Sequence, residues 1–124
     1  MKTRTKNYPL YETTVFEDFR IMTENVAAKY PNKIAYSFKE NPHKKEVTRK
    51  TFAETREYIV AMGTGLVSAG VREKHIAIVG EASYNWVTSY YACMSIGAVT
   101  VPIDKELPAD DIRSIIESAE CDFV

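Results

Sequence analysis

Two stretches of this sequence carry side chains that could take part in chemistry. The first is the loop 80–85, which follows the apolar segment 76–79 and contains Glu81 and Ser83. If that segment is a strand of a parallel sheet, the loop lies at its carboxyl end, where open α/β sheets bind ligands. The sequence favours a simpler interpretation, a tight strand-to-helix turn in which Ser83 caps the helix.

The second stretch is a group of carboxylates that could bind a cation or act as acid and base. Its members are Asp104, Glu106, Asp110 and Asp111. No His or Cys lies near them in the sequence, and Pro108 is typical of the first turn of a helix. Because carboxylates are favourable near the positive end of a helix, we interpret the group as a solvated loop followed by a helix start.

The glycines at Gly63, Gly65 and Gly70 suggest a phosphate-binding loop, but their context does not fit one. A dinucleotide loop places its third glycine three residues after the second, between a strand and a helix. Here Gly70 comes five residues after Gly65, and the first two glycines lie inside a helical apolar pattern. We therefore expect close helix packing at the first two glycines and a left-handed helix end at Gly70.

The other reactive side chains have no suitable neighbours in the sequence. His43 lies in a polar turn, His75 precedes a strand, and Cys93 and Cys121 lie in apolar runs without motif spacing. Two small basic groups are interpreted as a frayed terminus and a solvated loop; they are Lys2, Arg4 and Lys6, and His43, Lys44 and Lys45. The sequence thus assigns no catalytic, cofactor-binding or metal-binding residue.

The composition excludes several classes of protein. The 124 residues are 45% hydrophobic, enough for one domain with a core, and 16 basic against 17 acidic residues give a net charge of -1. This balance argues against a nucleic-acid surface. No apolar run is long enough for a membrane span, the polar start is unlike a secretory signal, and the unpatterned cysteines favour the reducing cytoplasm.

The first part of the chain predicts a helix and a hairpin. Thr14 and Glu17 have capping-box spacing, so we expect a helix over 15–30 that stops at Pro31. Alternating apolar residues then predict a strand at 34–38 with one buried face, followed by a turn and a short edge strand at 46–50.

The second part of the chain alternates strands and helices. Thr51 and Glu54 form a second capping box, and Pro102 is expected to end a strand. The expected elements are a helix from 51 to Gly70, a strand at 76–79 covered on both faces, an apolar helix from Ser83 to Gly97, a strand at 99–101, a helix from Pro108 with a buried stripe of Ile112, Ile115, Ile116 and Ala119, and the beginning of a strand at 123–124.

These elements define an α/β fold. Strands separated by amphipathic helices predict right-handed crossovers and a parallel sheet, here a Rossmann-like βαβαβ arrangement with an amino-terminal helix and a short β-hairpin. We expect residues 1–13 to be a flexible segment and 14–124 to be one domain. Because the sequence ends within an expected strand, we also expect that domain to be truncated.

Three segments of the sequence resemble a known family. They are YPNKIA at 30–35, TFAE at 51–54 leading to Gly70 and Val71, and GAVTVP at 97–102 followed by DKELP at 104–108. From about Thr14 onward the chain resembles the opening of the AMP-forming acyl-CoA synthetases, which are adenylate-forming ligases. The DKELP-type segment is most similar to the long-chain fatty-acid-CoA ligases.

The resemblance implies an enzyme that uses ATP, Mg²⁺ and coenzyme A in its full-length form. Its phosphate loop, ribose acid and catalytic lysine are expected beyond Val124, so no site residue is carried over to this chain. The fragment itself is then expected to need no cofactor, to be inactive, and to have the rest of the ligase as its partner, with a fatty acid or other carboxylate as substrate. We also expect it to self-associate through an open sheet edge or exposed faces of its last elements.

Two alternatives stay open on the sequence alone. The chain could come from another adenylate-forming enzyme, such as an acetate or aryl acid ligase or a peptide-synthetase adenylation domain. It could also be a stand-alone small α/β module that binds a nucleotide or a protein. A stand-alone module should unfold cooperatively as a monomer, whereas a fragment should expose apolar surface.

Overall fold

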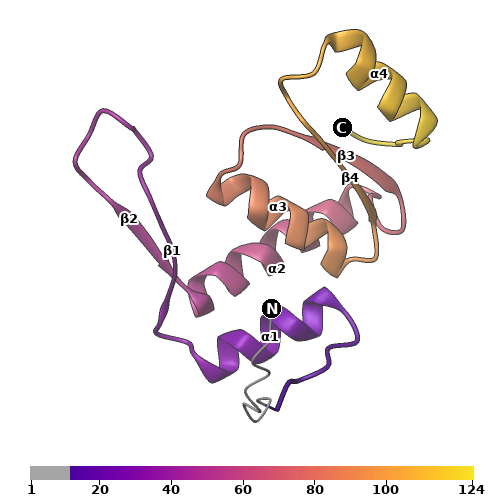
Figure 1. Cartoon of the computed structure of the whole chain (residues 1–124). Coiled ribbons are helices and arrows are strands. Elements are labelled where there is room, and N and C mark those ends of the chain that lie inside the picture. The colour runs from indigo at the N-terminus through magenta and orange to yellow at the C-terminus, as the bar shows by residue number, and fades with distance from the viewer. Residues whose placement is uncertain (1–11) are drawn as a thin grey trace, which may run out of the picture.

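The computed structural model describes residues 12–124, which fold into helices packed beside two small sheets (Figure 1). The elements are α1 (Phe19–Lys29), β1 (Ile34–Phe38), β2 (Thr48–Thr51), α2 (Phe52–Ser68), β3 (His75–Val79), α3 (Tyr84–Ser95), β4 (Val99–Ile103) and α4 (Ala109–Ser118). Helices α2 and α3 lie side by side at the centre, and α1 and α4 lie toward opposite ends of the molecule (Figure 1). The predicted α/β class, with an amino-terminal helix and a hairpin, is confirmed.

Helix α1 begins later than the sequence predicted. Its cap is Asp18, whose Oδ1 accepts a hydrogen bond from the backbone N–H of Ile21 at 2.7 Å. The predicted capping box at Thr14 and Glu17 is wrong, and Val15, the predicted first residue of the helix, lies outside it and is 90% exposed. Asp18 takes the capping role four residues later than predicted, and either side chain is suited to it because Thr and Asp can both act as an N-cap.

The hairpin of β1 and β2 is antiparallel, with Phe38 opposite Thr48 and Ile34 opposite Thr51. β2 therefore starts two positions later than predicted and leaves Val47 outside it. The prediction that one face of β1 is buried is only partly right. An irregularity in the register separates Ile34 from Tyr36, and Ile34 is 49% exposed.

The two aromatic residues of β1, Tyr36 and Phe38, pack on the first turn of α3. The ring of Phe38 stacks on that of Tyr84 with centroids 5.0 Å apart, and the ring of Tyr36 meets the same tyrosine edge-on at 5.4 Å. Tyr58 of α2 completes the cluster at 5.8 Å. Tyr84 is buried as a result, and it joins the hairpin to the helices.

Helix α2 starts directly at the end of the hairpin through the predicted capping box. The Glu54 N–H donates to Thr51 Oγ1 at 3.2 Å, and the Thr51 N–H donates to Glu54 Oε2 at 2.8 Å. The hydrogen bond from the Thr51 backbone lowers the pKa of Glu54. Gly70 follows the helix with φ +81°, so the left-handed helix end is also confirmed.

Close packing of α2 on α3 depends on Gly63. A Cβ atom at this buried position would lie 3.3 Å from Ile96 Cγ2, whereas a Cβ atom at Gly65 would meet open space. The expectation of close packing is thus confirmed at Gly63 and wrong at Gly65. The adjoining core consists of Val71, Ile76, Cys93 and Ala98, with Leu66, Ile78 and Ile96 packed against them.

β3 and β4 form the predicted parallel pair, in register from His75 opposite Val99 to Val79 opposite Ile103. On the other edge of β3, the Ala77 N–H donates to the Phe123 carbonyl at 2.9 Å. The strand expected at 123–124 is therefore a single parallel bridge at Phe123. The expectation that β3 is covered on both faces is only partly right, because Val79 is exposed.

Pro102 lies inside β4, so the prediction that it ends the strand is wrong. The Val99 N–H donates to the Lys74 carbonyl at 2.9 Å and therefore points toward β3. Alternate residues of a strand point the same way, which directs the backbone of Pro102 to the outer edge. Proline has no N–H to lose at that edge, and the strand continues through it to Ile103.

Helix α4 differs from the prediction in position and burial. Pro108 precedes the helix as its cap residue rather than occupying the first turn, while Asp110 and Asp111 do lie in that turn. The predicted apolar stripe is half-buried, and no residue of α4 is fully buried within the described part of the chain.

We predict that Thr51→Ala will lower the free energy of unfolding by about 1 kcal/mol, because it removes one of the two capping-box bonds. Thr51→Ser keeps the hydroxyl and is expected to stay within a few tenths of a kcal/mol of the original chain. Urea unfolding followed by circular dichroism measures both variants. Equal losses for the two would contradict the role of the hydroxyl.

Candidate functional site

The carboxyl ends of β3 and β4 meet at one edge of the parallel sheet and border an open cleft of about 380 Å³. Its lining residues are Gly80, Glu81, Ala82, Trp86, Pro102, Ile103, Asp104 and Lys105. The fold thus brings together the loop 80–85 and the start of the carboxylate-rich stretch, the two places where the sequence suggested chemistry. This is the position at which parallel sheets of this class place ligands.

Lys105 is the central charge of the cleft. Its Nζ lies 3.0 Å from Glu81 Oε1 and 2.6 Å from Glu106 Oε1. Hydrogen bonds to Glu106 and then to Glu81 raise the pKa of Lys105. Both carboxylates are largely exposed, so these ion pairs add little stability, but they bridge the two loops.

The remaining carboxylates of this stretch serve local structure. Asp104 Oδ1 accepts a hydrogen bond from the Glu106 N–H at 2.9 Å, and Asp110 pairs with Arg113 at 3.6 Å. Within residues 12–124, no three His, Cys, Asp or Glu side chains gather closely enough to hold a metal ion. These donors do not fit an Mg²⁺ site, which needs oxygen ligands converging in near-octahedral geometry.

The first turn of α3 forms the inner wall of the cleft. The Trp86 N–H donates to Ser83 Oγ at 3.1 Å, which confirms Ser83 as the helix cap. The Trp86 ring stacks on Tyr90 with centroids 5.5 Å apart, and its Cδ1 lies 3.4 Å from the place of a Cβ at Gly80. A Cβ atom at position 80 would therefore lie in van der Waals contact with this ring.

His75 lies at the opposite, amino end of β3 and has a structural role. Its Nδ1 is 2.7 Å from the Ala119 carbonyl oxygen, and its backbone N–H donates to Asp122 Oδ2 at 3.0 Å. Lys74 adds an ion pair to Asp122 at 3.5 Å. These contacts, made by residues distant in sequence, fasten the end of α4 to the sheet.

The other sequence candidates lie apart from the cleft. His43 donates its backbone N–H to Asn41 Oδ1 at 2.9 Å in the hairpin turn, and Gly63 and Gly65 lie within α2. Burial raises the pKa of Cys93; burial and then Asp122 raise that of Cys121, so both thiols are poor nucleophiles. Lys2, Arg4 and Lys6 lie outside the described residues.

Comparison with known proteins gives the family. The family model described as "AMP-binding enzyme" matches residues 23–124. This chain belongs to the AMP-binding enzyme family. The predicted resemblance to the AMP-forming acyl-CoA synthetases is thereby confirmed at the level of the family.

This chain aligns with only a small part of the length of individual relatives. The long-chain-fatty-acid–CoA ligase FadD15 of Mycobacterium bovis is 34% identical over 74 residues, which is 59% of this chain and 12% of FadD15. The hybrid PKS-NRPS synthetase xenE of Xenoacremonium sinensis is 39% identical over 80 residues, which is 62% of this chain and 2% of xenE. The chain is thus similar both to a fatty-acid–CoA ligase and to a hybrid PKS-NRPS synthetase.

A solved structure supports the fold of this chain. The NpsA N-terminal subdomain of Klebsiella oxytoca superimposes with a TM-score of 0.75 at 21% identity, covering 86% of this chain and 26% of that one.

None of the helices within residues 12–124 has both the length and the apolar character needed to cross a membrane.

We predict that Asp122 makes the stability of this chain sensitive to acid. The hydrogen bond from the His75 backbone, helped by Lys74, lowers the pKa of Asp122. A carboxylate with a lowered folded-state pKa stabilises the fold above its unfolded pKa of about 3.9, and the contribution is lost as pH falls through the lower folded pKa. Asp122→Asn should therefore lower the urea midpoint at pH 7 and lose less stability on acidification.

Glu117→Gln is the control for the loss of one carboxylate, because Glu117 is exposed on α4 and outside these contacts. Urea midpoints of the three proteins measured from pH 7 to 2 test the prediction. If Asp122→Asn follows the same pH dependence as Glu117→Gln, the stabilising contact with His75 has no energetic weight.

Proposed function

We propose that this chain is an amino-terminal part of the adenylation domain of an ATP-dependent acid–thiol ligase. The observation that carries the proposal is the family match over residues 23–124. The chain spans 12% of the length of FadD15, so the activity proposed is that of a longer protein to which this chain contributes. This chain contributes the parallel sheet and its covering helices to that longer protein.

The proposed reaction has two steps. A carboxylate attacks the α-phosphorus of ATP, which forms an acyl adenylate and releases pyrophosphate. The thiol of coenzyme A then attacks the acyl carbon, and AMP leaves. Activation is needed because the oxygen of a free carboxylate is a poor leaving group, whereas AMP is a good one.

The described residues support a scaffolding role in that reaction. The cleft at the carboxyl ends of β3 and β4 has one lysine already paired with Glu81 and Glu106, and its donors do not suit Mg²⁺. We therefore assign the phosphate, ribose and metal contacts to other parts of the full enzyme, with ATP, Mg²⁺ and coenzyme A bound there.

We propose a long-chain fatty acid as the substrate and the cytoplasm as the location. The substrate assignment rests on the segment DKELP at 104–108 together with the similarity to FadD15. The location rests on the two free cysteines, which are typical of a reducing compartment.

A second candidate is favoured by the similarity to xenE, which is higher in identity than that to FadD15. In that case the chain contributes to a peptide-synthetase adenylation domain or to an acetate or aryl acid ligase. The adenylation step is the same in both proposals, and the carboxylate and the acceptor thiol differ.

The decisive experiment begins with the native polypeptide. An antibody raised against this chain should detect a protein several times longer in the source cells. The protein it captures is then assayed for ATP–pyrophosphate exchange with palmitate, benzoate and a mixture of amino acids. Exchange with palmitate supports the proposal, exchange only with the other acids favours the second candidate, and a band near 14 kDa without exchange overturns both.

We predict that the isolated chain will show no exchange of pyrophosphate into ATP and no acyl-CoA formation above background. The described residues lack a convergent metal site, and the glycines of the sequence do not have the spacing of a phosphate loop, so the adenylation step has no electrostatic support. A full-length ligase of the family, assayed in parallel, serves as the positive control. Activity that survives removal of contaminating ligases would contradict the scaffolding role.

We also predict that the isolated chain self-associates. Phe123 is 39% and Val124 78% exposed, and the apolar stripe of α4 is only half-buried. Pro102 removes a donor from the outer edge of β4, so we expect the association to use the α4 face rather than that edge. Light scattering across a concentration series measures it.

Two charge substitutions on α4 test which face is used. Ile115→Glu on the apolar stripe should weaken association by about tenfold, because it places a charge in the contact. Ser114→Glu adds the same charge at an exposed neighbouring position and should have little effect. A cooperatively unfolding monomer at high concentration would instead favour the stand-alone binding module.

A further inference from the structure

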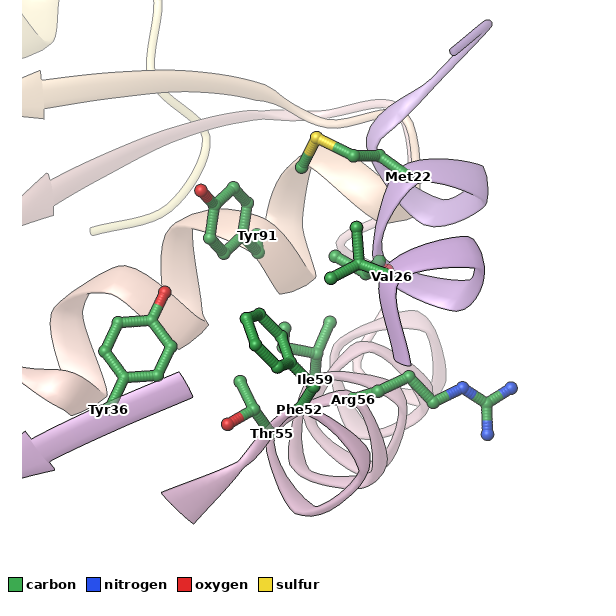
Figure 2. Close-up of a pocket in the computed structure, with 9 residues that line it drawn as sticks. Met22, Val26, Tyr36, Phe52, Thr55, Arg56, Ile59 and Tyr91 are labelled. Atoms are coloured by element: carbon green, nitrogen blue, oxygen red, sulfur yellow. The ribbon is translucent and has the colours of Figure 1, made fainter. Parts of the chain in front are cut away.

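A second cavity lies among α1, β1, α2 and α3 (Figure 2). Its volume is about 160 Å³, and it shares no lining residue with the cleft at the carboxyl ends of β3 and β4. The residues that line it are Met22, Thr23, Val26, Tyr36, Phe52, Thr55, Arg56, Ile59 and Tyr91. It is therefore a separate site, formed by elements that are distant in sequence.

The walls of this cavity are mainly apolar. Val26 of α1 faces Phe52 and Ile59 of α2, and Met22 and the ring of Tyr91 lie on the α3 side (Figure 2). A protein cavity of about 150 Å³ is large enough to take up benzene. The present volume thus suits one six-membered ring.

Most polar groups beside the cavity already make hydrogen bonds or ion pairs with other residues. The Thr23 hydroxyl donates to the Arg20 carbonyl at 2.9 Å, and Thr55 Oγ1 accepts a hydrogen bond from the Tyr84 hydroxyl at 3.5 Å. The guanidinium of Arg56 points away from the cavity (Figure 2) and pairs with Glu24 at 3.8 Å. The cavity therefore offers no cation to a bound anion.

Tyr36 supplies the polar group on the β1 side. Its hydroxyl is directed toward the space between β1 and α3 (Figure 2). A tyrosine hydroxyl is neutral at physiological pH, since its ordinary pKa is about 10. Burial, with smaller contributions from Tyr91 and Tyr84, raises the pKa of Tyr36 further. A neutral hydroxyl can both donate a hydrogen bond to a ligand and accept one from it.

We propose that this cavity is a binding site for a small, uncharged, single-ring aromatic molecule that carries one hydrogen-bonding substituent. The ring lies against Val26, Phe52 and Ile59, and the substituent meets the hydroxyl of Tyr36. A carboxylate is excluded because burying an anion without a counter-charge is costly. The site is thus distinct from any site for the acid that the proposed ligase would activate.

Phenol and benzoate are the probes that test the site. Titration of the chain followed by nitrogen-15 NMR should show saturable binding of phenol with a dissociation constant on the order of 1 mM, given seven non-hydrogen atoms. Shifted amides should belong to α1, β1, α2 and α3. Benzoate should bind at least about tenfold more weakly. No saturation with phenol at tens of millimolar, or equal binding of benzoate, would overturn the proposal.

Val26→Phe fills the cavity and should abolish phenol binding. Val67→Phe makes the same change at an exposed position of α2 and should leave the binding unchanged. Tyr36→Phe is the second variant, kept in case the first does not fold. It should weaken the binding of phenol about fivefold and leave the binding of benzene unchanged, because only the hydrogen bond is lost. Undiminished phenol binding in folded Val26→Phe, or in Tyr36→Phe, would contradict the assigned position.

Discussion

The packing of α3 against α2 is the contact on which the rest of the structure depends. Gly63 allows the close approach, and Thr88 at the centre of α3 is fully buried with its hydroxyl donating to the Tyr84 carbonyl at 2.8 Å. Tyr84 holds the hairpin, Tyr91 meets Phe19 of α1, and Cys93 joins the core under the sheet. Helix α3 therefore contacts α1, α2, the hairpin and the core beside the parallel sheet. Its displacement would separate the sheet from the amino-terminal half of the chain.

Features determined by neighbouring residues could be predicted from the sequence. The capping box at Thr51, the cap at Ser83 and the left-handed glycine at Gly70 each depend on bonds within one turn. The start of α1 could not be predicted in the same way, because Thr14 and Asp18 are both acceptable caps. Pro102 was misjudged because its effect depends on which edge of the strand it faces, and only the pairing with β3 decides that.

The candidate site was predictable in place but not in detail. Loops 80–85 and 104–107 both follow strands that were predicted to be parallel, so their meeting at one edge is a consequence of the predicted fold, although the sequence favoured only a turn and a helix start there. The role of Lys105 needs the folded structure, because Glu81 is distant in sequence and comes within 3.0 Å only there. The cavity beside Tyr36 had no signal at all. Its walls come from α1, β1, α2 and α3, and each lining residue looks like ordinary core when considered alone.

The proline in β4 has a consequence for the time before the fold is complete. During synthesis on a ribosome, β4 emerges after β3 and pairs with it, leaving one outer edge while the following residues are still being made. An edge strand with a complete row of unpaired backbone N–H and C=O groups can pair with other chains. Nascent chains that grow side by side on one messenger RNA are such partners. Pro102 interrupts that row on the β4 side, whereas the free edge of β3 is the one that later receives Phe123 in a parallel bridge.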